Sequence, residues 1–141
     1  PGHKTTVADA IRAYVQSLLK GTTTYIGLPK MLWPKQWHQW GMKRPMCLLK
    51  KALYGHPDAG GHWENHLNEA IRALGGEAIP NHPSSFWFPQ TKLFLTVYVD
   101  DLCLSGPEEE HEKFWKLLSK TIDLGEAEDL HRFLGRTHRF V

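Results

Sequence analysis

The sequence predicts an α+β fold, in which two helices pack on one face of a small antiparallel sheet. Apolar and β-branched residues fill both halves of Leu93–Gly106, which predicts a hairpin of two strands with Asp100 and Asp101 at its tip. Apolar residues recur every three or four positions in 57–74 and in 108–122, as is typical of helices with one buried side. Helices that share one face leave the other face of the sheet open to solvent.

Composition indicates one compact domain without a membrane partner. The 141 residues are enough for one core, and no stretch has the apolar length of a transmembrane helix or the pattern of a signal peptide. The net charge of +2 is modest, but basic residues gather in 30–51 while 108–129 is rich in acid. A phosphate backbone is therefore not expected to contact the acidic region. Cys47 and Cys103 lie in apolar surroundings and are predicted to be free, buried thiols.

The first third of the chain predicts three short elements. Threonines and a valine favour a strand over His3–Asp9, which ends at a carboxylate. We expect a helical turn over Val15–Leu19 and a second extended segment over Thr23–Leu28. Taken alone, Asp9 is better explained as an acid that ends a strand or caps a helix.

Three tryptophans, Trp33, Trp37 and Trp40, lie in the loop Leu32–Gly41. Large aromatic side chains usually serve packing, so the favoured interpretation is that these residues fix the loop to the core. The alternative is a surface that stacks on nucleic-acid bases, where each stacked base contributes about 1–3 kcal/mol.

The stretch Pro57–Leu74 predicts the longest helix, with Pro57 in its first turn and Gly75 and Gly76 ending it. Its buried stripe would consist of Trp63, Leu67, Ile71 and Leu74. On the same helix, His62 and His66 are four residues apart, which raises the alternative of a zinc site. The sequence offers no third ligand and lacks the His-Glu-x-x-His order, so we interpret both as surface histidines on the flank of the helix.

The remaining elements alternate strand and helix. Ser84–Phe88 predicts a strand before the Asp-Asp hairpin, and Leu130–Phe140 predicts a short strand or hairpin after the last helix. The helix Glu108–Ile122 would bury one side, made of Phe114, Leu117, Leu118 and Thr121.

The adjacent carboxylates of Asp100 and Asp101 need a physical explanation. Like charges a few ångströms apart repel, which raises one pKa unless a cation neutralises the pair. A solvent-facing turn explains the pair on its own, since Asp is common in turns. With Asp9 at the end of a neighbouring strand, however, three carboxylates would form a cage for Mg²⁺. Two such ions about 3.5–4 Å apart support in-line phosphoryl displacement.

Five blocks of the sequence resemble, in order, blocks of copia-type retrotransposon reverse transcriptases. Asp9–Tyr14 is similar to the motif in which a catalytic Asp is followed four residues later by Ala and then by an aromatic residue. Tyr98–Asp101 is similar to the tyrosine-x-Asp-Asp hairpin. The other blocks are Thr24–Pro29, Pro45–Gly55 and Asp129–Gly135.

The resemblance implies that residues 1–141 are a partial reverse transcriptase domain with a ferredoxin-like palm. Most of the fingers, the thumb and the ribonuclease H domain would lie elsewhere in a longer polyprotein that also includes an integrase. The implied partners are an RNA or DNA template with its primer, deoxynucleoside triphosphates and the other polyprotein domains. The implied location is intracellular, in cytoplasmic virus-like particles, and the isolated chain is expected to be inactive.

The resemblance also implies a role for each site residue. Asp9 and Asp100 would bind two Mg²⁺ ions, or Mn²⁺, with Asp101 in a weaker or outer contact, for two-metal nucleotidyl transfer to a primer 3′-hydroxyl. Tyr14, beside Ala13, would be the aromatic gate that excludes a ribose 2′-hydroxyl, although a core tyrosine explains it without the resemblance. Tyr98 and Val99 would lie near the primer terminus.

Two positions depart from the family pattern. Asp58 stands where the family has a Gln that contacts the incoming nucleotide, and Gly61 stands where it has an Arg. Asp58 would either add a metal ligand or repel the substrate, so we retain it as a candidate substrate-binding residue.

Three hypotheses follow, from different classes of protein. The first is an RNA-directed DNA polymerase palm that functions within a polyprotein. The second is a catalytically inactive, decayed or repurposed retroelement fragment that retains the palm fold. The third is an unrelated metal-dependent phosphoryl-transfer enzyme.

Overall fold

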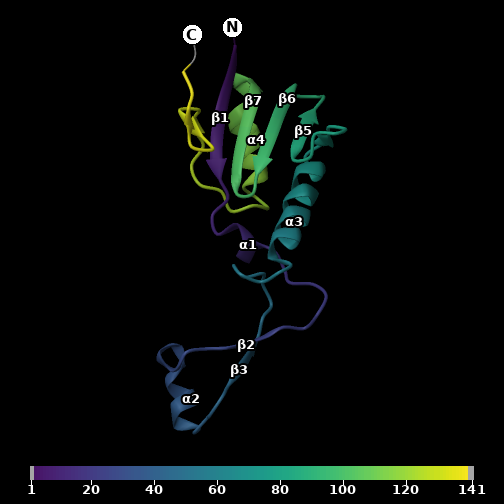
Figure 1. The fold of residues 1–141 in the computed structure, drawn as a ribbon. Coiled ribbons are helices and arrows are strands. Elements are labelled where there is room, and N and C mark those ends of the chain that lie inside the picture. The colour runs from purple at the N-terminus through teal and green to yellow at the C-terminus, as the bar shows by residue number, and fades with distance from the viewer. Residues whose placement is uncertain (1, 140–141) are drawn as a thin grey trace.

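Six strands form one antiparallel sheet in the computed structural model, which describes residues 2–139 (Figure 1). The strand order is β4-β5-β6-β7-β1-β8. The strands are β1 His3–Asp9, β4 Glu77–Ala78, β5 Ser85–Phe88, β6 Leu93–Tyr98, β7 Asp101–Pro107 and β8 Glu128–Asp129. The predicted α+β fold with an antiparallel sheet is confirmed, while its finer assignment to a reverse-transcriptase palm stays a prediction.

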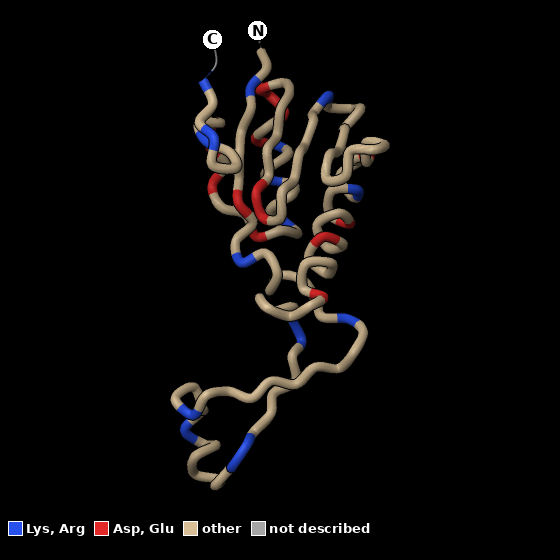
Figure 2. Tube along the Cα trace, viewed as in Figure 1, with Lys and Arg blue, Asp and Glu red and all other residues tan. Residues whose placement is uncertain are grey.

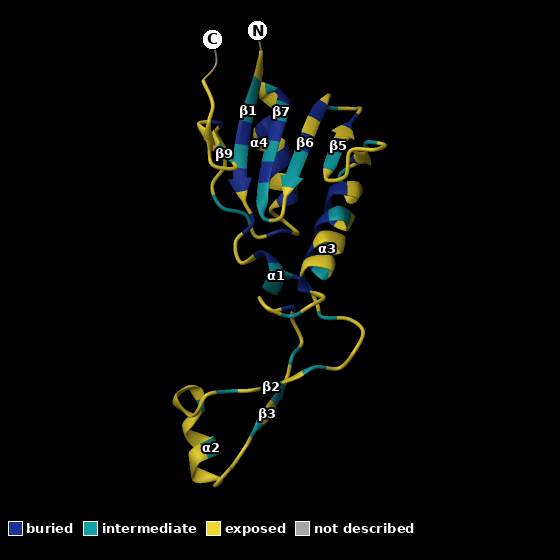
Figure 3. Ribbon diagram, in the orientation of Figure 1, coloured by how far each residue is buried: buried dark blue, intermediate teal, exposed yellow. Residues whose placement is uncertain are grey.

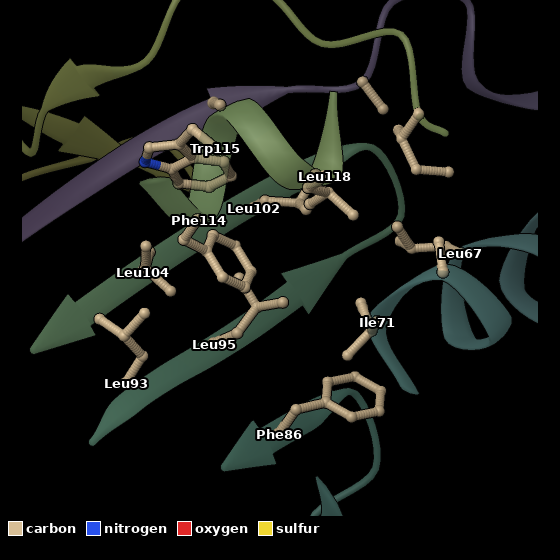
Figure 4. Close-up of a cluster of buried hydrophobic side chains, with 14 of the residues drawn as sticks. Leu67, Ile71, Phe86, Leu93, Leu95, Leu102, Leu104, Phe114, Trp115 and Leu118 are labelled. Atoms are coloured by element: carbon tan, nitrogen blue, oxygen red, sulfur yellow. The ribbon is translucent and has the colours of Figure 1, made fainter. Parts of the chain in front are cut away.

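Two helices, α3 (Ala59–Ala73) and α4 (Glu108–Leu118), cover the same face of this sheet (Figures 1 and 4). Successive strand residues point to opposite faces, so the alternate leucines of β6 and β7 turn toward the helices. Each fully buried leucine contributes about 1.5–3 kcal/mol. Leucines 93, 95, 102 and 104 of the sheet meet Leu67 and Ile71 of α3 and Phe114 and Leu118 of α4.

Helix α3 matches its prediction closely. It begins at Ala59, just after Pro57, and Gly75 follows its end with φ 90°, a backbone conformation that favours glycine. In the predicted stripe, Trp63, Leu67 and Ile71 are buried and Leu74 is partly buried against the core.

Helix α4 is shorter and rotated relative to its prediction. It ends at Leu118, and Leu117, predicted as buried, is 47% exposed. The buried residues are His111, Phe114, Trp115 and Leu118. Thr6 explains this rotation, because its hydroxyl is 2.8 Å from His111 Nδ1 and accepts a hydrogen bond from Trp115 Nε1 at 2.9 Å. These hydrogen bonds turn the rings of His111 and Trp115 toward β1, so Leu117 faces solvent.

An arm projects from the sheet, and we name residues 20–51 the basic arm (Figures 1 and 3). Strands β2 (Tyr25–Gly27) and β3 (Met46–Leu48) pair antiparallel and carry the 3₁₀ helix η1 (Lys30–Leu32) and helix α2 (Lys35–Gln39). The predicted packing of its tryptophans on the core is wrong, because none of the three belongs to the core cluster.

The chain closes with a short hairpin, as predicted for Leu130–Phe140. Strands β9 (Arg132–Phe133) and β10 (Arg136–Thr137) pair antiparallel. Phe140, the last residue of the predicted segment, lies outside the described residues.

Two further properties concern the membrane and the cysteines. No helix within residues 2–139 combines the length and apolarity needed to cross a bilayer. Cys47 and Cys103 are free, as predicted, but half-buried rather than buried. Burial raises the pKa of the Cys103 thiol above 9.0, so this thiol stays protonated at neutral pH.

Candidate functional site

Strand pairing brings Asp9 and Asp101 together at one end of the sheet. Strand β1 pairs with β7 in a register that sets Asp9 opposite Asp101. In β7 the buried residues Leu102 and Leu104 alternate with residues on the open face, so the pleat puts Asp101 on the open face. The exposed Asp9 and the partly buried Asp101 line the same cavity.

Asp100 lies beside this pair, in the two-residue turn between β6 and β7. The other turn residue, Val99, has φ 56°, an outlier conformation for a β-branched side chain. Two hydrogen bonds hold the turn: Trp63 Nε1 donates to the Val99 carbonyl at 2.6 Å, and the Ala10 N–H donates to the Asp100 carbonyl at 2.7 Å. Because α3 and β1 both fix the turn, it keeps a conformation that would otherwise relax.

Burial and the neighbouring carboxylates change the acidity of Asp101. The pKa of Asp101 is raised above its ordinary value of 3.8, first by burial, then by the hydrogen bond with Asp9, and then by the negative charges of Asp9 and Asp100. The raised pKa means that Asp101 takes up a proton more readily than an ordinary Asp does. A bound cation would offset the same repulsion and would compete with that proton.

The three-carboxylate cage predicted from the sequence is not preformed. Within residues 2–139, no three His, Cys, Asp or Glu side chains are arranged to hold a metal ion, and this includes His62 and His66. Mg²⁺ is commonly held by one or two carboxylates together with substrate phosphates. The Asp9–Asp101 pair, with Asp100 beside it, therefore fits the donor chemistry of this ion.

Three of the predicted substrate-binding residues meet in one cavity. Tyr14, Tyr98 and Val99 line a cavity of about 320 Å³, whose wall also includes Trp63 of α3. Tyr14 belongs to helix α1 (Ala13–Gln16), which begins two residues earlier than the predicted helical turn. Its ring lies 4.5 Å, centroid to centroid, from the ring of Tyr54.

The structure separates Ala13 and Asp58 from this group. Ala13 is 1% exposed and packs in the core, so its methyl group faces other side chains rather than a ligand. Asp58 is exposed at the N-cap of α3, and it lines neither the cavity of Tyr14 nor that of the paired carboxylates. Its backbone N–H donates to His56 Nδ1 at 3.2 Å.

The C-terminal hairpin is a part of the site that the sequence did not predict. Phe133, Leu134 and Gly135 line a cavity of about 260 Å³ together with Asp9 and Asp101. Leu134 and Gly135 have φ 48° and 76°, which suits the two-residue turn of a tight hairpin. Leu134 and Gly135 are the sequence signal for the turn itself. No local pattern indicates that the hairpin packs beside Asp9 and Asp101.

Tyr54 and Trp63 are also contacts that the sequence analysis did not assign to the site. Tyr54 packs on Tyr14, and Trp63 holds the Val99 turn. Both residues lie in or just after the block Pro45–Gly55, which was the only signal that connected them with the carboxylates.

The chain is similar to two curated polyproteins of Arabidopsis thaliana. It is 31% identical over 93 residues to the retrovirus-related Pol polyprotein from transposon RE2, and 32% identical over 94 residues to the one from transposon RE1. These matches support a retrotransposon Pol origin.

Each match covers 64% of this chain but only 6% of the relative, so the chain spans a small part of the length of these relatives. No family model matches the chain. No solved structure matches it either. The support for a retrotransposon Pol origin therefore comes from similarity to curated polyproteins.

Proposed function

We propose that this chain is the palm portion of an RNA-directed DNA polymerase from a copia-type retrotransposon. The observation that carries the proposal is the register that sets Asp9 opposite Asp101, next to the clamped turn that holds Asp100. The resemblance of both motifs to reverse transcriptases and the similarity to Pol polyproteins support it. The reaction would be transfer of a deoxynucleotide to a primer 3′-hydroxyl.

In this proposal Asp9 and Asp100 hold two Mg²⁺ ions, or Mn²⁺, while Asp101 makes a weaker or outer contact. The ions would make the primer hydroxyl more acidic and offset the charge of the departing pyrophosphate. The chain itself would orient the carboxylates, through the β1–β7 pairing and the clamped turn. No side chain would act as a nucleophile.

Nucleotide selection would depend on the cavity lined by Tyr14. Tyr54 supports the Tyr14 ring from one side, so the ring would reject a ribose 2′-hydroxyl by occupying its space. Tyr98 and Val99 line the same cavity and would lie near the primer terminus. Ala13 would contribute through the core, by fixing the start of α1.

The proposal also includes the surroundings of the domain. Template RNA or DNA with its primer, deoxynucleoside triphosphates, integrase and ribonuclease H would be its partners in a longer polyprotein, within a cytoplasmic virus-like particle. The isolated chain would have little or no polymerase activity.

A catalytically inactive or repurposed retroelement fragment is the second candidate function. Two positions favour it: Asp58 adds a negative charge at the start of α3, and Gly61 supplies no positive charge in the first turn of that helix. Both changes would weaken the attraction of a triphosphate to this helix terminus.

Calorimetric titration of Mn²⁺ into the purified chain tests the proposal. We expect binding by the native chain and no binding by the Asp100→Asn/Asp101→Asn double variant. Glu128→Gln/Asp129→Asn is the matched control, because it removes two negative charges from the exposed strand β8. Equal binding by all three proteins would refute the assignment of the carboxylates.

A second titration, in the presence of deoxythymidine triphosphate, supplies the phosphate ligands that a polymerase site shares with its metal ions. If no carboxylate-dependent binding occurs even then, the inactive fragment becomes the better description.

A further inference from the structure

The basic arm carries positive charge without any negative charge. Residues 20–51 contain seven of the seventeen Lys and Arg residues and none of the fifteen Asp and Glu residues. Figure 2 shows this separation between the arm and the sheet. Within residues 2–139, the cations that form ion pairs are Lys4 and Lys113, and both lie outside the arm. An exposed surface of one sign attracts a polyanion.

At the tip of the arm, two tryptophans are half-buried and the third is exposed. Trp33 Nε1 donates to the Leu28 carbonyl at 2.8 Å, and the rings of Trp33 and Trp37 meet edge to face at 6.3 Å. Trp40, at the C-terminal end of α2, is 64% exposed. Trp33 and Trp37 pack on each other at the tip, whereas the ring of Trp40 remains accessible to a ligand.

Two exposed cations follow Trp40 within four residues of the chain. Gly41 has φ 66° and turns the chain, and Lys43 and Arg44 follow it on the way into β3, both exposed. An aromatic face beside cations is the combination that binds single-stranded nucleic acid, since bases stack on the ring and phosphates pair with the cations. Exposed apolar residues such as Met31 suit a protein partner as well, but a protein partner does not explain why the arm lacks acid.

We propose that the basic arm binds single-stranded RNA, with Trp40 stacked on an unpaired base and Lys43 and Arg44 against neighbouring phosphates. The choice of RNA rests on the proposed function, which takes an RNA template. The contact would lie on the arm, outside the cavities lined by the carboxylates and by Tyr14.

Fluorescence anisotropy with a labelled, unstructured 20-nucleotide RNA tests the stacking contact in the 141-residue chain. We expect Trp40→Ala to weaken binding about tenfold, with an unchanged dependence on salt. Met31→Ala is the matched control, because it removes an 89% exposed apolar side chain from the same arm without removing an aromatic face. Binding by Met31→Ala should equal that of the native chain.

Salt titration tests the phosphate contacts. The Lys43→Gln/Arg44→Gln double variant should lower the slope of log K against log salt by about 1.4, because each phosphate contact with a single strand contributes about 0.7. Lys116→Gln/Lys120→Gln, which removes two exposed cations from the region of α4, should leave the slope unchanged.

Two results would overturn the proposal: native RNA affinity in the Trp40→Ala and Lys43→Gln/Arg44→Gln variants, or equal affinity for duplex and single-stranded RNA. The Asp100→Asn/Asp101→Asn variant separates this proposal from the proposed polymerase function. It should bind the RNA through the arm as the native chain does. Arm-dependent RNA binding without any metal binding by the carboxylates would refute the polymerase function alone.

Discussion

The sheet with its two helices and the basic arm use the same kinds of residue in opposite ways. In the sheet and its helices, aromatic and aliphatic side chains from seven elements form one buried cluster, and the carboxylates lie at the end of two strands and in the turn beside them. In the arm, aromatic side chains pack mainly on one another, and several large apolar residues stay exposed (Figure 3). The comparison shows that hydrophobic residues form the core of the first region and remain partly on the surface of the second.

The two regions should therefore unfold differently. A two-stranded ribbon such as β2–β3 is only marginally stable by itself. The arm depends on a few internal contacts, whereas the sheet depends on many that reinforce one another. Substitutions of one type should consequently cost more in the sheet than in the arm.

The largest difference is expected for truncation of an apolar side chain. Leu95→Ala, in the centre of the core at 0% exposure, should lower the free energy of unfolding by about 4 kcal/mol, through lost burial and a cavity. Met31→Ala in the arm should change it by less than about 0.5 kcal/mol. Urea denaturation followed by tryptophan fluorescence measures both, and similar losses would contradict the division into two regions.

A matched pair of indole hydrogen bonds gives the next comparison. Trp63 Nε1 donates to the Val99 carbonyl at 2.6 Å in the sheet, and Trp33 Nε1 donates to the Leu28 carbonyl at 2.8 Å in the arm. Trp63→Phe should cost about 2 kcal/mol, because Trp63 is 2% exposed and its loss frees the strained turn. Trp33→Phe should lower the free energy of unfolding by about 0.5 kcal/mol. Trp33 is half-buried, so a water molecule can donate to the Leu28 carbonyl in place of the indole.

Thermal unfolding of the two variants measures this difference. Mn²⁺ titration adds a second readout, because only Trp63→Phe should weaken binding at the carboxylates. A larger loss of stability for Trp33→Phe than for Trp63→Phe would show that the arm is the better packed region.

The turns of the two regions differ in backbone strain. Val99 has φ 56° in the carboxylate turn, whereas the arm turn after α2 uses Gly41 at φ 66°. Val99→Gly should raise the free energy of unfolding by about 1 kcal/mol, because relief of the left-handed strain exceeds the added entropy of the unfolded chain. Gly41→Val should lower the stability of the arm by a similar amount. Denaturant midpoints measure both, and a destabilised Val99→Gly variant would mean that the turn is not strained.

The sequence predicted the elements whose signals are local. The alternating residues of Leu93–Gly106 and the stripe through Trp63, Leu67 and Ile71 each lie within one element, and the structure confirms both. The resemblance of Asp9–Tyr14 to a reverse-transcriptase motif indicated that the strand ending at Asp9 lies beside the Asp100–Asp101 hairpin. The register of Asp9 with Asp101 follows once the pleat of both strands is known.

Other features depend on contacts between distant residues and left no local pattern. The rotation of α4 depends on Thr6, which lies 105 residues before His111, so periodicity alone selected Leu117 wrongly. The tryptophans of the arm looked like packing residues, which is true of Trp33 and Trp37, but their packing partners lie within the arm. The approach of the hairpin around Leu134 to Asp101 is a tertiary contact of the same kind.

The smallest expected effect concerns charge in the sheet, and it depends on pH. Between 3.8, the ordinary pKa of Asp, and the raised pKa of Asp101, the folded chain holds a proton that the unfolded chain has lost. The stability contributed by this proton is fully present below pH 3.8 and is lost as pH rises through the raised value. Asp101→Asn cannot titrate, so it should become more stable than the native chain as pH rises.

Urea midpoints from pH 3.5 to pH 7 measure this crossover, with Asp58→Asn as the control for an exposed carboxylate whose side chain makes no capping hydrogen bond. Mg²⁺ should then make the native chain the more stable of the two at pH 7, because a cation offsets the repulsion between Asp9 and Asp101 and is attracted less by the neutral Asn of the variant. A difference between the two proteins that stays constant with pH would mean that the pKa of Asp101 is not raised in the folded chain. If Mg²⁺ does not change which of the two proteins is more stable, a bound cation does not explain why Asp9 and Asp101 lie together.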